Sequence, residues 1–165
     1  MESQEGAADA ATPSREGHAM AATTLVVGLD GSAACERVLD FAKRQARAME
    51  SARIVLCYVI EWSPFSFQTP EENEQRHRRR EEEIGLARSR ILDPSLAALS
   101  GEGFEAEGVV RHGDAAEILD RLARERGAAQ IVIGRVGGRG LRDRVFGGVS
   151  GRLVAGSAVP VTIVP

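Results

Sequence analysis

The sequence predicts a doubly wound α/β fold, in which helices cover both faces of a five-stranded parallel sheet. The expected strands are short, continuous apolar runs, which is typical of a parallel sheet that is buried on both faces. Segments with helical spacing of apolar residues separate these strands, as they do in β-α-β units. The chain has 165 residues, enough for one such domain without a stabilising disulfide or metal.

The beginning of the chain is expected to lie outside this domain. Residues 1–22 are polar and alanine-rich, show no apolar periodicity, and carry four acidic residues against one arginine. We therefore expect a disordered N-terminal tail over 1–22 and a folded domain over 23–165. The tail accounts for the whole formal net charge of −3, so the folded domain is expected to be close to neutral.

The first half of the domain contains two predicted strands, each followed by a predicted helix. The first strand ends at Asp30, and either Asp30 or Ser32 is expected to cap the helix that follows. A second apolar run, ARIVLCYVI over residues 52–60, predicts a buried strand. Residues 71–99 then open with acidic residues and arginines three and four apart, which predicts a solvent-exposed helix with ion pairs along it.

The second half continues the alternation of strands and helices. A strand over residues 104–110 leads to a helix that Asp114 is expected to cap, with Glu117 completing a capping box. The fourth strand ends at Gly134, and a loop rich in glycine and arginine leads from it to a short helix. The chain closes with a fifth apolar strand, VPVTIVP.

Composition and motifs argue against several classes of protein. The near-zero net charge argues against a dedicated nucleic-acid binder. No apolar run approaches the ~20 residues of a membrane span, and no signal-peptide pattern is present, so a cytoplasmic protein is expected. Cys35 and Cys57 form no metal or redox spacing and are expected to be buried and unreactive. The only lysine, Lys43, lies in a predicted helix and is expected to be solvated.

Catalytic motifs are also missing. The sequence contains neither a phosphate-loop motif nor a Gly-x-Ser-x-Gly elbow. His112 and Asp114 are near enough in sequence to suggest an acid/base pair, but no nucleophile accompanies them. Helix capping by Asp114 is the better explanation of that carboxylate.

The segments that follow the strands are where a ligand is expected, because such sheets bind ligands beyond the carboxyl ends of their strands. Gly147, Gly148 and Gly151 fall at or near the start of a helix, although a glycine inside a helix costs about 1 kcal/mol relative to alanine. Two explanations remain open: backbone N–H groups that approach a phosphate, or close packing of the helix on the sheet. Asp30 is likewise either a ligand-binding residue or only a turn residue.

The glycine spacing resembles that of the universal stress proteins. ATP-binding members of this family carry a glycine, two residues, a glycine, nine residues, a glycine, and then Ser or Thr. Gly134, Gly137 and Gly147 have this spacing. The resemblance extends over residues 23–165, through the segments VVGLDGS, CYVIEW and SAVPVTIVP. It implies a Rossmann-like fold of the adenine nucleotide alpha hydrolase-like type, with strand order 3-2-1-4-5.

The resemblance implies a site for ATP or another adenine nucleotide, with Mg²⁺ or Mn²⁺ bound through the phosphates. Asp30 would contact the ribose or help to hold the metal. Val59 would offer backbone polar groups to the adenine, beside an apolar wall formed by Ile133. The other implied contacts come from three segments that would present mainly their backbones: Gly28 and Leu29; Gly134, Val136 and Gly137; Gly147, Gly148, Val149 and Ser150.

One residue departs from the family pattern. Gly148 stands where the pattern has Ser or Thr, so a hydroxyl donor to phosphate is missing. A hydrogen bond to a charged group contributes about 1.5–3 kcal/mol, and its loss weakens binding by one or two powers of ten. Ser150 offers a hydroxyl two residues further on, which would compensate in part.

The resemblance also implies a homodimer that forms through the last strand. Val159, Val161 and Ile163 would give that strand an apolar edge, and such edges favour self-association. Three functional hypotheses follow. We favour a regulatory, ATP-binding stress protein; the alternatives are a nucleotide-free dimeric interaction module with a lapsed site, and a slow ATPase.

Overall fold

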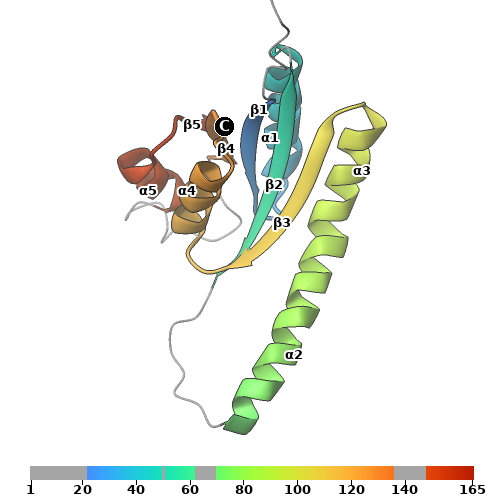
Figure 1. The fold of residues 1–165 in the computed structure, drawn as a ribbon, viewed down its shortest axis with the longest axis vertical. Coiled ribbons are helices and arrows are strands. Elements are labelled where there is room, and N and C mark those ends of the chain that lie inside the picture. Colours follow the sequence, from blue (N-terminus) through green and yellow to red (C-terminus); the bar gives the residue numbers. More distant parts are fainter. Residues whose placement is uncertain (1–21, 50, 62–69, 136–147) are drawn as a thin grey trace, which may run out of the picture.

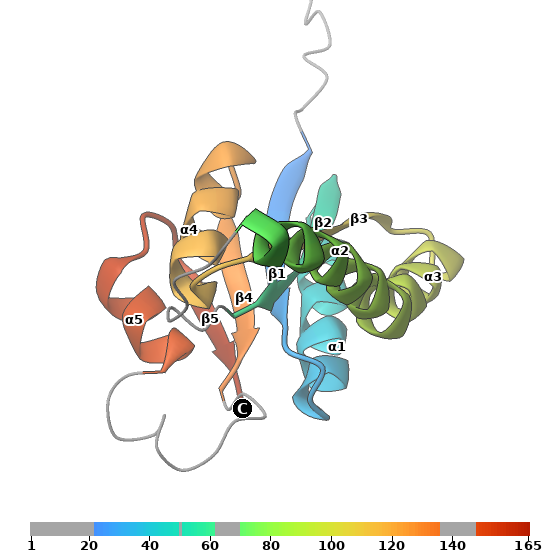
Figure 2. The same cartoon turned by 90° about the horizontal axis from the view of Figure 1, so that it is seen from below.

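The computed structural model describes residues 22–49, 51–61, 70–135 and 148–165. They form a parallel sheet with the strand order β3-β2-β1-β4-β5, and helices pack on both of its faces (Figures 1 and 2). The predicted fold class and strand order are thereby confirmed. The strands are β1 (Thr23–Leu29), β2 (Ala52–Ile60), β3 (Glu105–His112), β4 (Gln130–Gly134) and β5 (Val161–Val164).

The helices follow the predicted alternation. In the described part of the chain they are α1 (Ala34–Arg47), α2 (Pro70–Ala87), α3 (Asp93–Gly101), α4 (Ala115–Glu125) and α5 (Val149–Gly156). A π-helical segment, Arg88–Leu92, joins α2 to α3, so the three together correspond to the single helix expected over 71–99. The widened turn comes directly before Pro94, whose ring would crowd the carbonyl of Arg90 in a regular α-helix. In Figure 1, α2 projects past the sheet.

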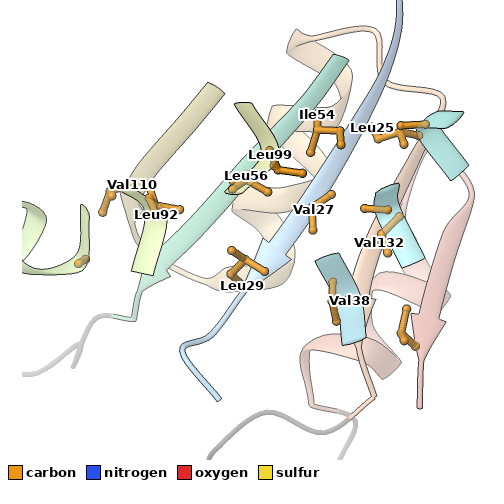
Figure 3. Packing of buried hydrophobic residues seen from close by; sticks show 14 residues of the cluster. Leu25, Val27, Leu29, Val38, Ile54, Leu56, Leu92, Leu99, Val110 and Val132 are labelled. Carbon is orange, nitrogen blue, oxygen red and sulfur yellow. The ribbon is translucent and has the colours of Figure 1, made fainter. Parts of the chain in front are cut away.

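Strand β1 lies at the centre of the sheet and is buried on both faces. Leu25, Val27 and Leu29 pack with residues of α1 and α3 (Figure 3). Val26 points to the opposite face and packs with α4 and α5. Because side chains of a strand alternate between faces, a strand covered on both sides needs a continuous apolar run, as the sequence has here.

The sheet grows in opposite directions from β1. β2 and β3 lie on one side of it, whereas β4 and β5 lie on the other. The register pairs Leu29 with Tyr58 of β2 and Val27 with Val132 of β4. Such a reversal is the place at which doubly wound sheets bind ligands, beyond the carboxyl ends of the two diverging strands.

The predicted capping residues have different outcomes. Asp114 caps α4 as expected, and its Oδ1 accepts a hydrogen bond from the backbone N–H of Glu117 at 3.1 Å. The expectation for α1 is wrong, because its N-cap is Ala33 and no side chain caps the helix. Asp30 and Ser32 precede the N-cap position, where their side chains accept bonds from the N–H groups of Ser32 and Ala34 and shape the turn.

The expectation for Lys43 is also wrong. Its side chain is only 15% exposed, and Nζ lies 2.6 Å from Oε1 of Glu102. Arg47 lies 2.6 Å from the other carboxylate oxygen of Glu102. The two cations join α1 to the residue that follows α3. Such a long-range ion pair leaves no trace in the local pattern of the sequence.

The two thiols differ in burial. Cys57 is buried as expected, and loss of solvation raises its pKa to about 12. Cys35 is only half-buried, and its pKa is also raised, chiefly by burial.

In the described residues, no helix is both long enough and apolar enough to span a membrane. The predicted tail over 1–22 lies outside the described residues except for Ala22.

Candidate functional site

Asp30 and Gly134 come from neighbouring strands at the reversal point of the sheet. Strands β1 and β4 pair through Val27 and Val132. Asp30 directly follows β1, and Gly134 is the last residue of β4. The two predicted site residues therefore lie at the same edge of the sheet, although about a hundred residues separate them in the sequence.

Several predicted site residues share the face of the sheet that α4 and α5 cover. Val59, Ile133 and Val149 belong to the hydrophobic cluster on this face. Gly28 faces the same way, since a Cβ built there would lie 2.9 Å from Cγ2 of Ile133. Leu29 points into the cluster on the opposite face and is 5% exposed, so only its backbone faces the carboxyl edge.

Helix α5 begins beside the end of β4. Gly148 is its N-cap and has no side chain to cap the helix. The Ser150 hydroxyl donates a hydrogen bond to the backbone carbonyl of Arg135, which directly follows β4, at 3.4 Å. The first N–H groups of a helix lack intrahelical partners, and they carry a partial positive charge. Val136, Gly137 and Gly147 lie outside the described residues.

The packing explanation can be tested for three glycines. Close packing requires glycine at position 28, because an added Cβ would lie 2.9 Å from Ile133 and 3.0 Å from Leu119. At Gly134, an added Cβ would make ordinary contacts at 3.4 and 3.5 Å. At Gly151, it would meet no described atom within 4 Å. Internal packing thus accounts for Gly28, but it does not require glycine at positions 134 and 151.

The Asp30 carboxylate is held in a defined position at the end of β1. Its Oδ1 accepts a hydrogen bond from the N–H of Ser32 at 3.0 Å and lies 3.4 Å from the Cys35 thiol. Asp30 is nevertheless exposed. Asp30 is therefore a turn residue, which was one of the two roles expected for it. Its carboxylate is also accessible at the edge of the sheet, so the turn leaves the ligand-binding role open.

Arg152, on α5, is a cation at the same edge of the sheet. Its guanidinium forms an ion pair with the carboxylate of Asp114. Partial burial tends to raise the pKa of Asp114, but bonds from Arg152 and from the Glu117 amide outweigh it and hold that pKa below its ordinary value. The position of Arg152, four residues after Gly148, is a sequence signal, because residues four apart share one helix face.

A hollow lies elsewhere on the molecule. It has a volume of about 300 Å³ and lies between the end of β2 and the helical segments before α3, with Tyr58, Leu86 and Arg90 among its lining residues. Tyr58 packs against the hydrophobic cluster on the α1 and α3 side. This hollow is therefore on the opposite face of the sheet from Val59 and Ile133.

The described residues offer no cluster of three or more His, Cys, Asp or Glu side chains that would hold a metal ion.

Residues 22–165 match the family model described as "Universal stress protein family". This chain belongs to the universal stress protein family. The universal stress protein YxiE of Bacillus subtilis (strain 168) is 27% identical to it over 146 residues, which cover 85% of this chain and 97% of YxiE.

Solved universal stress protein structures resemble the chain over nearly the whole domain. A member of the family from Burkholderia pseudomallei is 27% identical, with a TM-score of 0.59 and coverage of 87% of this chain and 96% of that one. A universal stress protein in complex with cAMP is 25% identical, with a TM-score of 0.60 and coverage of 87% and 97%. The universal stress protein fold thus spans β1 to β5.

Proposed function

We propose that this universal stress protein binds ATP, or another adenine nucleotide, at the carboxyl edge of β1 and β4. The observation that carries the proposal is the position of the α5 N-terminus beside the end of β4, where Ser150 contacts Arg135. Partnerless N–H groups and the positive end of the helix dipole favour a phosphate at such a place. The absence of a packing requirement for glycine at positions 134 and 151 supports this assignment.

The other end of the nucleotide is assigned to the ends of β1 and β2. The exposed carboxylate of Asp30 suits the ribose hydroxyls, which donate hydrogen bonds to it. Val59 offers backbone groups to the adenine edge, and Ile133 provides an apolar surface beside the ring. The adenine nucleotide cAMP in the complex of a related universal stress protein supports this class of ligand.

A divalent cation, Mg²⁺ or Mn²⁺, is expected to enter with the phosphates. As the alternative to its ribose contact, Asp30 would help to hold this cation, since a single carboxylate together with phosphate oxygens is a common way to bind Mg²⁺. The cation would neutralise part of the phosphate charge. In that alternative, the remaining ligands would be phosphate oxygens and water.

We assign the protein a regulatory role in which nucleotide occupancy, rather than ATP turnover, is the signal. We also place it in the cytoplasm, where ATP is supplied.

The proposed form of the protein is a homodimer that pairs through β5. This strand bonds to β4 on one side and ends the sheet on the other. An edge strand rich in valine and isoleucine is a natural surface for self-association.

One observation favours a second candidate, a dimeric interaction module whose nucleotide site has lapsed. Gly148 provides no hydroxyl, and the hydroxyl of Ser150 is engaged by the carbonyl of Arg135. In this hypothesis, the glycine-rich segment is structural and the dimer acts without a nucleotide.

Direct binding separates the two candidates. The protein is purified without added nucleotide, denatured, and analysed by chromatography for released ATP or ADP; calorimetry then measures ATP binding in the presence of magnesium. We expect released nucleotide or binding in the micromolar to millimolar range. Asp30→Asn should weaken binding, whereas the control Asp93→Asn, in an exposed pair with Arg88 on α3, should not. No released nucleotide and no binding at millimolar ATP would establish the lapsed site.

A further inference from the structure

Arg152 lies one helical turn from the start of α5. Its backbone N–H bonds to the carbonyl of Gly148 at 3.1 Å, so the two residues are directly above one another on the helix. Side chains on a helix lean toward its N-terminus. The side chain of Arg152 therefore extends toward the end of α5 that the proposed function assigns to the phosphates.

Asp114 meets Arg152 from another element at the same edge of the sheet. It follows β3 and caps α4, with Oδ1 bonded to the Glu117 amide and Oδ2 to the Arg152 guanidinium. Helix α4 is anchored by buried side chains such as Leu119 and Leu122. The carboxylate is thus a fixed point that restricts the long arginine side chain.

We infer that Arg152 is a phosphate-binding residue of the proposed nucleotide site, and that Asp114 is the positioning residue that holds it there. This inference rests on the proposed function. The side chains of Arg152 and Asp114 are 46% and 32% exposed, so a ligand has access to them. An ion pair this exposed contributes little to stability, which makes a purely structural role a poor explanation for it.

The chemistry of the guanidinium suits this role. Arginine carries five N–H donors in a planar fork, and the bond to Asp114 engages only Nη1. The remaining donors can bind phosphate oxygens in pairs. Asp114 also balances the positive charge when no ligand is bound, and holding the side chain in advance lowers the entropy cost of binding.

Arg152 places a cation on the first turns of α5 itself. The only lysine, Lys43, is bound to Glu102 between α1 and α3, on the other face of the sheet. Gly148 provides no hydroxyl, and the Ser150 hydroxyl already bonds to a carbonyl. A cation on the first turns of α5 would offset the missing hydroxyl donor.

The test compares ligands with and without phosphate. Calorimetry measures the binding of ATP with magnesium and of adenosine to the wild-type protein, to Arg152→Gln and to Arg121→Gln. Arg121 is an exposed arginine on α4 that pairs with Glu125, and it serves as the matched control. We expect Arg152→Gln to weaken ATP binding by about ten- to a hundred-fold, to leave adenosine binding unchanged, and to melt at nearly the wild-type temperature; Arg121→Gln should bind both ligands normally.

A double-mutant cycle tests the role of Asp114. Asparagine retains the capping acceptor, so Asp114→Asn should preserve α4 while it releases the guanidinium. We expect Asp114→Asn to weaken ATP binding when Arg152 is present and not to weaken it further in the Arg152→Gln protein. Weakening by Asp114→Asn in both backgrounds would overturn the positioning role.

The outcomes separate this inference from the function on which it rests. If the wild-type protein binds neither ligand, the proposed nucleotide site is wrong, and the inference falls with it. If the wild-type protein binds ATP and Arg152→Gln binds it equally well, only the assignment of Arg152 is overturned. Equal weakening of ATP and adenosine binding by Arg152→Gln would also overturn it, because it would reveal a general distortion of the site.

Discussion

The Ser150 hydroxyl donates a hydrogen bond to the carbonyl oxygen of Arg135 at 3.4 Å. This bond joins the first turn of α5 to the end of β4 and so sets the distance between them. It also occupies the hydroxyl that, in the sequence, was expected to compensate for glycine at position 148. To serve a phosphate, the Ser150 hydroxyl would have to give up this bond.

Gly148→Ser is expected to tighten ATP binding by about ten-fold or more, because it adds a hydrogen-bond donor at the N-cap of α5. Calorimetry with ATP and magnesium measures the change. The matched control is Gly148→Ala, which adds a Cβ without a hydroxyl and should not improve binding. Equal affinities for all three proteins would mean that this helix start does not contact the phosphates.

Gly28→Ala is expected to destabilise the fold by about 1–3 kcal/mol. The added Cβ would lie 2.9 Å from Ile133 and 3.0 Å from Leu119, both in the packed core. Urea unfolding measures the loss. Gly151→Ala is the control: its Cβ meets no described atom within 4 Å, so its free energy of unfolding should rise by up to about 1 kcal/mol. Similar effects of the two substitutions would contradict the packing at β1.

The two cysteines are expected to report on the site through their rates of alkylation. Cys57, with a pKa of about 12, should resist iodoacetamide at pH 8 until the protein unfolds, because the thiolate is the reactive form. Cys35 is half-buried and lies 3.4 Å from Asp30, so bound ATP should slow its modification. Mass spectrometry resolves the two sites. An unchanged Cys35 rate at saturating ATP would place the nucleotide away from Asp30.

The ion pair of Asp114 is expected to make stability depend on pH. A carboxyl group with a lower pKa in the native than in the unfolded state stabilises the fold above its unfolded value, and this contribution is lost as the pH falls through the native pKa. Asp114→Asn should therefore be only slightly less stable than the wild type at pH 7, as an exposed ion pair allows, and this small difference should shrink as the pH falls below the ordinary value of 3.8. Urea midpoints at pH 7, 5 and 3 test this; a difference that stays constant over that range would refute it.

Val161→Asp is expected to convert the proposed dimer to a monomer, since it places a charge on the edge strand β5, where Val161 is partly buried against the cluster that α4 and α5 cover. Light scattering after size exclusion measures the mass, and circular dichroism verifies that the variant is folded. Leu86→Asp, on a helix at the other side of the sheet and 51% exposed, should leave the mass unchanged. A folded Val161→Asp protein that remains dimeric would rule out β5 as the interface.

Local patterns in the sequence predicted the elements of the sheet well. A strand such as β2 is buried on both faces, and that burial leaves a continuous apolar run that can be read directly. The cap of α4 was predictable for the same reason, because Asp114 and Glu117 are only three residues apart. The cap of α1 was not predictable. Asp and Ser residues are common both at helix caps and in turns, and here Asp30 and Ser32 form a turn directly before the helix.

Contacts between distant residues could not be predicted from such patterns. Lys43 and Glu102 are 59 residues apart, and Arg152 and Asp114 are 38 apart. Each pair is brought together only by the packing of helices on the finished sheet. The candidate site could be proposed because its residues lie at strand ends. The place of Arg152 on the first turns of α5 could also be predicted from its spacing to Gly148, but its ion pair with Asp114 could not.

The central position of β1 has a consequence for the order of folding. Residues 23–29 leave the ribosome first among the strands, and they can pair with β2 soon afterwards, but they must wait for residue 130 before β4 covers their other edge. Pairings of such long sequence separation form slowly and leave apolar edges exposed in the meantime. The edge at which a nucleotide is proposed to bind is therefore among the last parts of the protein to form, and a chain that stops before β4 contains the Asp30 turn without that strand beside it.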